Sequence, residues 1–241
     1  MRRMVALAAA ALLGCAHSGN RPAPIFVYAS QTGQITLDQG DGGGNPFASA
    51  LVELAGRDAL TSGEFLNGLV ALTVRKSRDF QHPDVTGPGL KDTWQFLPKP
   101  ATERRVALVL VFSEYSASGE LSSLPGAQCD AFRVSANLER AGFVTQTVVD
   151  PDVSRLEIVL RNFAKTSSGA DIALLYTTGH GADVDNEVYL FPCDFPISEG
   201  KPALRKHAIP VSRLGAAMHA THANLLLYGG CRDNPFCVQG P

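Results

Sequence analysis

Residues 224–236 read NLLLYGGCRDNPF, and this stretch decides the fold. A short apolar run stops at two glycines and Cys231, and polar and turn-forming residues follow at once. Such a run predicts a buried parallel strand that carries a thiol to the edge of a sheet. Residues 172–181 read IALLYTTGHG, which is the same design with His180 at the strand end.

The two strand ends carry the pair of residues that a cysteine hydrolase needs. The histidine must lie within hydrogen-bond reach of the thiol, so that it can hold the thiolate and later protonate the leaving group. A single cysteine or histidine in such a place is more often structural. In a parallel sheet, however, sites lie beyond the carboxyl ends of the strands. We therefore expect His180 and Cys231 to meet there.

Apolar runs alternate with amphipathic segments through the rest of the chain, which predicts an α/β fold with a parallel sheet and helices on both faces. The further predicted strands are residues 25–29, 93–97, 106–112, 143–149 and 188–191. The predicted helices are an apolar stripe over 47–55, a helix opened by a capping box at Thr61–Glu64, a helix over about 129–141, a helix opened by a second capping box at Ser154–Glu157, and a short helix at about 214–219.

Residues 1–15 read MRRMVALAAAALLGC and do not belong to the predicted fold. Two arginines precede a short apolar region that ends in small residues, as in a secretory signal. The apolar region is too short for a permanent membrane span. Residues 12–15 resemble the lipobox of bacterial lipoproteins, which implies cleavage before Cys15, lipidation of its thiol and export to the outer side of the membrane. The alternative is an ordinary secretory signal with an incidental cysteine.

Composition sets further limits on the function. The formal net charge is −2 and the sequence holds no basic block, so nothing points to a nucleic-acid partner. Four cysteines would lie in the folded part: Cys129, Cys193, Cys231 and Cys237. Their spacing matches no zinc motif, and four in a chain of this length do not form a disulfide framework. A bond between Cys231 and Cys237 would silence the proposed nucleophile, so it would be an artefact or a redox switch.

The segment from Val106 to Phe236 resembles the large-subunit half of the caspase and metacaspase superfamily. The histidine motif is residues 178–181, TGHG, and the nucleophile motif is residues 231–236, CRDNPF. His180 lies 51 residues before Cys231, close to the separation in caspases. Residues 125–131, which include Asp130, resemble an early helix start that carries an acidic residue in this family.

The first half of the chain resembles the small-subunit half of the same family. The resemblance rests on residues 26–30, 37–38, 45–47 and 93–96. Because this half normally follows the nucleophile, the resemblance implies a circularly permuted domain with a six-stranded, mostly parallel sheet. The expected order is a signal (1–15), a tether (16–24), the small-subunit-like half (25–98), a linker (99–105) and the large-subunit-like half (106–241), with 25–241 forming one domain. Many relatives are activated by cleavage of the loop that joins the nucleophile segment to the small-subunit half. The permuted order has no peptide bond at that point, which implies that this chain is active without cleavage between its halves.

The resemblance also implies roles for single residues. Cys231 would be the nucleophile and His180 the acid and base. The backbone N–H groups of Gly181 and Cys231 would form the oxyanion hole. Asp130 would stand at the base of the first specificity pocket and favour Arg or Lys in a peptide substrate. Ser30 would line that pocket beside the strand edge to which a substrate adds.

One departure from the family pattern affects that pocket. Bacterial members and metacaspases usually carry an aspartate two residues before the nucleophile, where this chain has Gly229. The double glycine could also loosen the strand end. The acidic residues Asp183, Asp185 and Glu187 follow His180; we expect a solvated turn there, with calcium as the only cofactor to consider. His219 and His222 have spacing that could hold a metal, but a solvated helix end is the simpler interpretation.

These observations predict a lipid-anchored, exported, caspase-like cysteine endopeptidase that needs no metal or cofactor. The main alternative is an inactive caspase-like lipoprotein that serves as a binding or scaffold module; Gly229 and the short tail after Cys231 favour it. A thiol redox protein that uses Cys231 and Cys237 is a weaker alternative, because the sequence has no CxxC motif.

Overall fold

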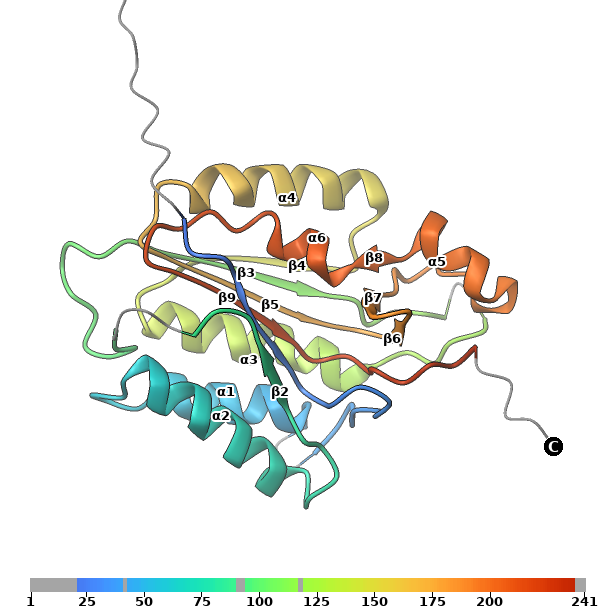
Figure 1. Cartoon of the computed structure of the whole chain (residues 1–241), viewed down its shortest axis with the longest axis horizontal. Coiled ribbons are helices and arrows are strands. Elements are labelled where there is room, and N and C mark those ends of the chain that lie inside the picture. Colours follow the sequence, from blue (N-terminus) through green and yellow to red (C-terminus); the bar gives the residue numbers. More distant parts are fainter. Residues whose placement is uncertain (1–20, 41–42, 90–93, 117–118, 237–241) are drawn as a thin grey trace, which may run out of the picture.

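A computed structural model describes residues 21–40, 43–89, 94–116 and 119–236. Its centre is a six-stranded sheet (Figure 1). In spatial order the strands are β2 (Asp84–Thr86), β1 (Ile25–Tyr28), β9 (Ala223–Tyr228), β5 (Ile172–Thr178), β3 (Arg105–Val111) and β4 (Val144–Val149). All neighbours are parallel except β1 and β2, which pair antiparallel. The predicted mostly parallel α/β sheet is confirmed, and the first strand of the chain lies inside it.

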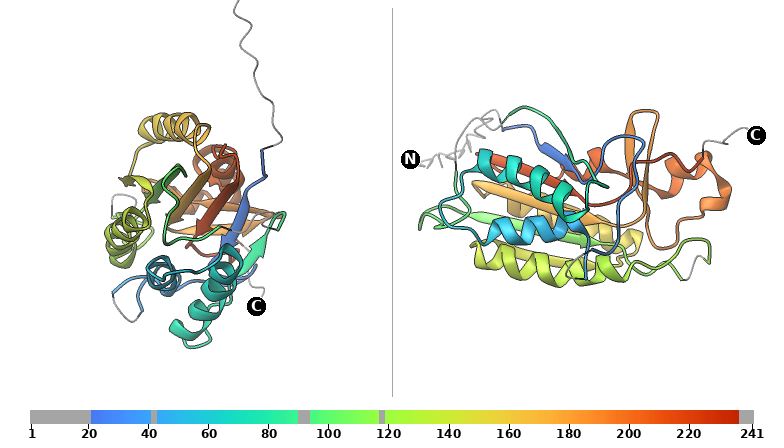
Figure 2. Two further views of the ribbon diagram at one scale, coloured as in Figure 1. Left: turned by 90° about the vertical axis from the view of Figure 1, so that its left-hand side faces the viewer. Right: turned by 90° about the horizontal axis from the view of Figure 1, so that it is seen from below.

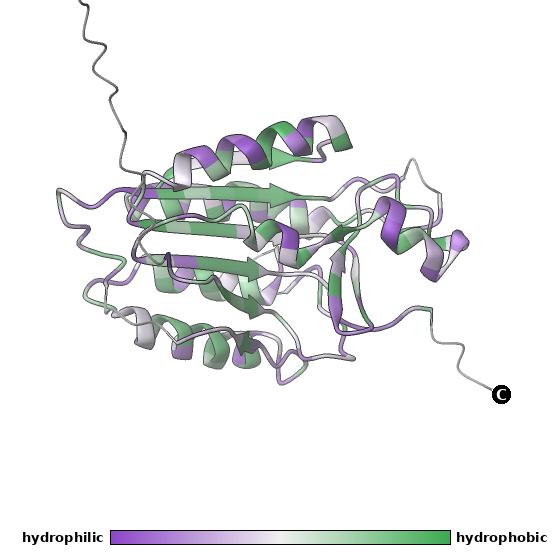
Figure 3. Cartoon of the chain, turned by 45° about the horizontal axis from the view of Figure 1, so that its top comes forward, coloured by the Kyte–Doolittle hydropathy of each residue, from purple (hydrophilic) through white to green (hydrophobic). Residues whose placement is uncertain are grey.

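Helices cover both faces of the sheet (Figure 2). One face packs against α1 (Pro46–Ala55), α2 (Ser62–Lys76) and α3 (Pro125–Arg140), and the other packs against α4 (Val153–Ser167) and α6 (Val211–Gly215). Alternate residues of one strand enter different cores: Val109 packs on the first face and Leu108 on the second. The central strands β9, β5 and β3 are therefore mostly apolar on both sides, as their largely green ribbons in Figure 3 show.

A small second sheet follows β5 at the carboxyl end of the large one. It consists of β6 (Gly181–Val184), β7 (Glu187–Leu190) and β8 (Ile209–Pro210), with α5 (Lys201–His207) beside it. Asp185 and Asn186 have positive φ angles of 54° and 64°, as the two-residue turn of a tight hairpin requires. The acidic segment that we expected to be a solvated turn is thus the tip of the β6–β7 hairpin.

Helix starts follow local chemistry. The capping box at Thr61 is confirmed: the Thr61 hydroxyl accepts from the Glu64 N–H at 3.3 Å, and the Glu64 carboxylate accepts from the Thr61 N–H at 2.9 Å. The second predicted capping box is wrong. Helix α4 begins one residue earlier than Ser154, because the carboxylate of Asp152 accepts from the Arg155 N–H at 2.7 Å and serves as the N-cap.

The start of α3 is held from a distant part of the chain. Its N-cap residue, Leu124, makes no side-chain cap. The carboxylate of Asp38 instead accepts from the N–H groups of Gly126 and Ala127, each at 2.9 Å. A carboxylate at a helix N-terminus satisfies two donors and interacts favourably with the helix dipole. The loop before α1 is thereby fixed to α3.

The predicted strand at residues 93–97 does not form in its described part, residues 94–97. The alternating Trp94 and Phe96 side chains are buried against α2, with the Phe96 ring centroid 4.2 Å from that of Phe65. The edge strand is β2, at residues expected to be loop. The fully buried Arg105 donates to the carbonyl groups of Gln95, Phe96 and Ala141. It is the first residue of β3, so the predicted linker ends inside the sheet.

Other boundaries differ only slightly. Helix α3 begins before the predicted residue 129, and the short helix predicted at about 214–219 is α6. Helix α5 lies in a segment that we expected to be loop. No helix among the described residues is both long and apolar enough to cross a membrane. Residues 1–20, with the predicted signal and Cys15, lie outside the described residues.

Candidate active site

The ends of β5 and β9 set the position of the candidate site. The two strands are parallel neighbours with Thr177 opposite Tyr228, so their next residues leave the sheet together. The Gly229 N–H continues the ladder and donates to the Thr177 carbonyl at 2.7 Å. His180 and Cys231 therefore lie at the same edge of the sheet, beyond the carboxyl ends of the strands, as the sequence predicts.

The Cys231 thiol is partly buried and is covered by a residue from the first half of the chain. Its sulfur accepts from the Thr36 N–H at 3.3 Å and lies 3.5 Å from the Thr36 hydroxyl. Burial raises the pKa of the Cys231 thiol, the Thr36 hydrogen bonds lower it, and the Asp233 carboxylate raises it; the net direction is upward. The resting sulfur is thus a protonated thiol, which needs a base to become a nucleophile.

The His180 ring is oriented by backbone and aromatic groups. Its Nε2 lies 2.8 Å from the carbonyl of Ser122. Since a carbonyl can only accept, we assign the proton to Nε2, which leaves Nδ1 as the basic nitrogen of the neutral ring. The Tyr115 ring packs edge-on with its centroid 4.6 Å from that of His180, and the Tyr115 hydroxyl accepts from the His180 N–H at 3.0 Å.

No hydrogen bond joins His180 to Cys231 in the described part of the chain; the sulfur contacts Thr36 instead. Catalytic hydrogen bonds are often long in a substrate-free enzyme and tighten in the complex. The arrangement supplies both a thiol and an imidazole with a free basic nitrogen at one edge, which is the equipment for acyl transfer.

The register of the β6–β7 hairpin orients the N–H of Gly181. The Phe191 N–H donates to the His180 carbonyl at 2.8 Å, so Gly181 occupies a non-hydrogen-bonded position of this antiparallel pair. Its N–H therefore points away from β7. The N–H of Asp183, two residues further and on the same side, donates to the Asp233 carbonyl at 2.9 Å. This side of β6 faces the segment that carries Cys231.

Arg232, the residue after the thiol, is the centre of a buried polar network. The residue is only 7% exposed, and its guanidinium stacks on Tyr28 at 4.2 Å from the ring centroid. It forms ion pairs with Asp183 and Asp84, each at 2.9 Å. It also donates to the Thr32 hydroxyl at 2.6 Å. The network joins the cysteine loop, the β6 strand after His180, the β2 edge and the loop after β1.

Asp130 is fully buried below the end of β9. One of its oxygens accepts from the Asn45 N–H at 3.0 Å and from the Tyr176 hydroxyl at 3.4 Å. Asn45 also donates from its side chain to the Gly229 carbonyl at 3.1 Å, which places Asp130 two hydrogen bonds from the strand end. Burial raises the pKa of Asp130 to about 7, against the lowering effects of the Asn45 N–H and the Arg133 charge.

Ser30 is also buried and lies in the loop that covers the thiol. Its hydroxyl donates to the Gln34 carbonyl at 3.3 Å, and its own carbonyl accepts from Arg232 at 3.3 Å. Its contacts shape the loop that ends in Thr36. A role in substrate binding stays a prediction for both Ser30 and Asp130.

The two glycines before Cys231 are packed closely. A Cβ on Gly230 would lie 2.5 Å from the Tyr228 hydroxyl and 2.7 Å from the Gly179 carbonyl, so no side chain fits there without a shift. The Tyr228 hydroxyl in turn lies 3.2 Å from both the Tyr189 and the Cys231 carbonyl oxygens, which share its one proton. The Tyr228 hydroxyl thus holds the end of β9 in place, although the double glycine in the sequence indicated a looser strand end.

The remaining candidate residues have other partners. Asp185 pairs with Lys201, and His222 lies 3.7 Å from Asp171. Within the described ranges, no group of three His, Cys, Asp or Glu side chains could hold a metal ion. The thiols of Cys129, Cys193 and Cys231 are free, whereas Cys237 lies outside the described residues.

Several site residues were not predicted from the sequence. Thr36, Asn45, Tyr115 and Ser122 all lie outside the predicted helices and strands, and the resemblance that includes Asn45 assigns it no role. Asn45 carries a local signal, because an Asn-Pro pair before an apolar stripe is typical of a helix start. Ser122 contributes only its carbonyl group, so its residue type carries no signal.

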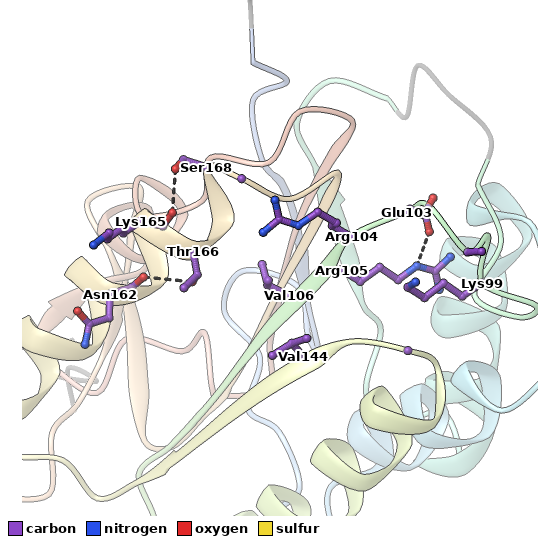
Figure 4. A pocket seen from close by; sticks show the side chains of 13 residues that line it. Lys99, Glu103, Arg104, Arg105, Val106, Val144, Asn162, Lys165, Thr166 and Ser168 are labelled. Atoms are coloured by element: carbon purple, nitrogen blue, oxygen red, sulfur yellow. Dashed lines mark hydrogen bonds and ion pairs between the residues drawn. The ribbon is translucent and has the colours of Figure 1, made fainter. Parts of the chain in front are cut away.

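A separate cavity of about 880 Å³ lies at the opposite end of the sheet (Figure 4). It is bordered by the predicted linker, the amino ends of β3 and β4, and the end of α4. The cationic side chains of Lys99, Arg104 and Lys165 are drawn around it in Figure 4. It shares no residue with the His180–Cys231 edge.

Comparison with known proteins supports the fold. Residues 104–238 match a family model described as a caspase domain. This match covers more than half of the chain and includes both strand ends with His180 and Cys231. No curated protein matches the chain.

Proposed function

Because the chain belongs to the caspase domain family of cysteine peptidases, we propose that it is a cysteine endopeptidase in which Cys231 and His180 form the catalytic dyad. The observation that carries the proposal is the parallel register of β5 and β9, which delivers both residues to one edge of the sheet. The free Nδ1 of His180 and the protonated thiol of Cys231 are complementary partners for proton transfer.

The proposed reaction follows from these groups. Nδ1 of His180 takes the thiol proton, and the thiolate attacks the peptide carbonyl carbon. The N–H groups of Gly181 and Cys231 stabilise the negative oxygen of the tetrahedral intermediate. The imidazolium then gives its proton to the amine as the C–N bond breaks, which leaves a thioester on Cys231. Water, deprotonated by His180, hydrolyses the thioester and restores the thiol.

The proposed substrate carries Arg or Lys at P1, the residue whose carbonyl is attacked. A P1 side chain that enters beside Gly229 would approach Asp130, because Asn45 links the Gly229 carbonyl and the Asp130 carboxylate. Burial raises the pKa of Asp130 to about 7, and a substrate cation beside this carboxyl group would favour its charged form. Ser30 would help to shape this pocket.

The chain order adds a proposal on activation. Residues 25–98 precede the matched segment, yet β1 pairs with β9 inside the same sheet. We take this half as the small-subunit-like part of a circularly permuted domain. Activity then requires no cleavage between the halves. Purified protein that is active only after a cut between Pro98 and Arg105 would contradict this.

The proposed location is the outer side of the membrane, through a lipid on Cys15. The proposal rests on the signal-like composition of residues 1–15. Cells that express the full chain should incorporate a radioactive fatty acid into it. A lack of label in the wild type, or label that survives Cys15→Ala, would refute the anchor.

Hydrolysis of a fluorogenic peptide with Arg at P1 tests the peptidase proposal. We expect cleavage by the wild type and its loss in Cys231→Ala and in His180→Ala. Cys129→Ala is the matched control, because Cys129 is a free cysteine with an exposed side chain and its loss should leave the rate unchanged. Activity that persists in folded Cys231→Ala would exclude the assignment.

One observation favours the second candidate, an inactive binding or scaffold module. The Cys231 sulfur is hydrogen-bonded to Thr36 and not to His180. A folded protein that hydrolyses no peptide, and whose Cys231 ignores peptidyl chloromethyl ketones, would support this candidate.

A further inference from the structure

Asp130 already has a resident cationic partner from its own helix. The Arg133 guanidinium lies one turn further along α3 and donates to the second Asp130 oxygen at 3.3 Å. The other arm of the same guanidinium donates to the Ser49 hydroxyl on α1 at 2.9 Å. The Asp130 carboxylate is fully buried, whereas the Arg133 side chain is 27% exposed. Arg133 thus reaches the carboxylate from the solvent side.

The backbone of Gly44 closes over this ion pair. A Cβ on Gly44 would overlap both the Asp130 carboxylate and the Arg133 guanidinium. Only a glycine lets the chain pass so close to the two charged groups. The carboxylate is therefore covered by Gly44 and Asn45 above and by Arg133 at the side. A ligand cation can reach the Asp130 oxygen that Arg133 occupies only by displacing that guanidinium.

Gly229, two residues before the nucleophile, offers no second carboxylate. A Cβ on Gly229 would lie 3.0 Å from the Thr178 hydroxyl and 3.3 Å from the Tyr176 hydroxyl, the same hydroxyl that donates to Asp130. Position 229 therefore lies against the Tyr176 hydroxyl that contacts Asp130, and its glycine adds no charge. Asp130 and Arg133 are the charged pair of this part of the site, and their formal charges cancel.

We propose that Arg133 is a specificity-determining residue, because its guanidinium occupies the carboxylate that would otherwise receive a basic P1 side chain. This inference rests on the proposed peptidase function and deepens it. A substrate with Arg at P1 must compete with the internal guanidinium, whereas a neutral side chain of similar length does not need the carboxylate. The internal ion pair therefore reduces the preference of the enzyme for basic over neutral P1 residues.

Removal of Arg133 should sharpen that preference. In Arg133→Ala the buried carboxylate loses its cationic partner, and a substrate guanidinium is then the strongest partner that can replace it. We expect the ratio of kcat/KM for a P1-Arg peptide to that for its P1-Gln analogue to rise at least tenfold, mainly through KM. Arg133→Gln, which can still donate to Ser49, should show the same change if the variant with alanine folds poorly.

Matched variants separate specificity from structure. Arg140→Ala removes an arginine from the last turn of the same helix, where it bonds only to α3, and should leave the ratio unchanged. The double variant Arg133→Ala with Asp130→Asn should show no gain, because the carboxylate that receives the substrate is gone. A merely structural role of Arg133 would lower the rates for both peptides equally.

Calorimetric binding to the Cys231→Ala protein tests the inference without catalysis. The P1-Arg peptide should bind at least tenfold more tightly after Arg133→Ala, with no change for the P1-Gln peptide. Equal binding of both peptides before and after the change, or no binding of either, overturns the inference. A wild type that hydrolyses neither peptide while the binding preference shifts refutes the proposed activity but leaves the inference in place.

Discussion

Replacement of Asp130 with asparagine should change the pH dependence of stability. Burial raises the pKa of Asp130 from 3.8 to about 7. The folded state therefore keeps a proton on this carboxyl group over a range in which the unfolded state has lost it. The stabilising contribution is full below about pH 4 and is lost as pH rises to about 7. The raised pKa corresponds to about 4 kcal/mol of unfolding free energy.

Urea denaturation of wild type and Asp130→Asn in a series of buffers measures this contribution. The unfolding free energy of the wild type minus that of the variant should fall by about 4 kcal/mol between about pH 4 and about pH 7, and should be constant at higher pH. In an Arg133→Ala background the fall should extend to higher pH, because the Arg133 charge lowers the pKa of Asp130.

Asp58→Asn serves as the control, since Asp58 is an exposed residue between α1 and α2. A difference between wild type and Asp130→Asn that stays within about 1 kcal/mol over the whole range, or that rises with pH, would refute the reasoning. Asp130 would then be charged in the folded protein, and its burial would not carry the cost assigned to it.

Three further changes test the contacts around the site. Arg232→Met should lower the unfolding free energy by about 3–5 kcal/mol in urea denaturation, because Asp183 would remain buried without its cation; a loss below about 1 kcal/mol would contradict the network. Thr36→Val should move the midpoint of Cys231 alkylation by iodoacetamide to higher pH, because the Thr36 side-chain hydrogen bond lowers the pKa of the thiol; a lower midpoint would be inconsistent with that contact. Phe96→Ala should cost about 3–5 kcal/mol in the same denaturation assay, since its ring is fully buried in the core under α2, and a near-neutral effect would place it outside that core.

The sequence predicts the strands that carry the chemistry because their signal is local. Residues 172–176 and 225–228 are apolar runs, each followed by a glycine within three residues, and such a run is what a strand buried on both faces requires. Their chain order and the parallel pairing rule then bring His180 and Cys231 to one edge.

The parts that the sequence does not predict depend on tertiary contacts. Trp94 and Phe96 alternate like strand residues, but both side chains are buried and the Phe96 ring packs on Phe65. Arg105 donates to the backbone carbonyls of Gln95 and Phe96. Strand β2 is only three residues long, and both its first and its last residue, Asp84 and Thr86, are polar. It therefore lacks an apolar pattern. Its pairing with β1 defines it instead.

The same reason explains the site residues that were not predicted. The Ser122 carbonyl and the Thr36 N–H are backbone groups, and any residue type could supply them. Arg133 lies on a predicted helix, but only the packing of Gly44 and Ser49 against that helix gives its charge a role in the pocket.

The most direct measurement of the proposed dyad is mass spectrometry of the folded protein after treatment with an arginyl chloromethyl ketone. We predict a single adduct on Cys231, which forms far more slowly in His180→Ala, while the free thiols of Cys129 and Cys193 remain unmodified. Modification of Cys231 at the same rate without His180, or a folded wild type with no adduct on Cys231, would contradict the assignment.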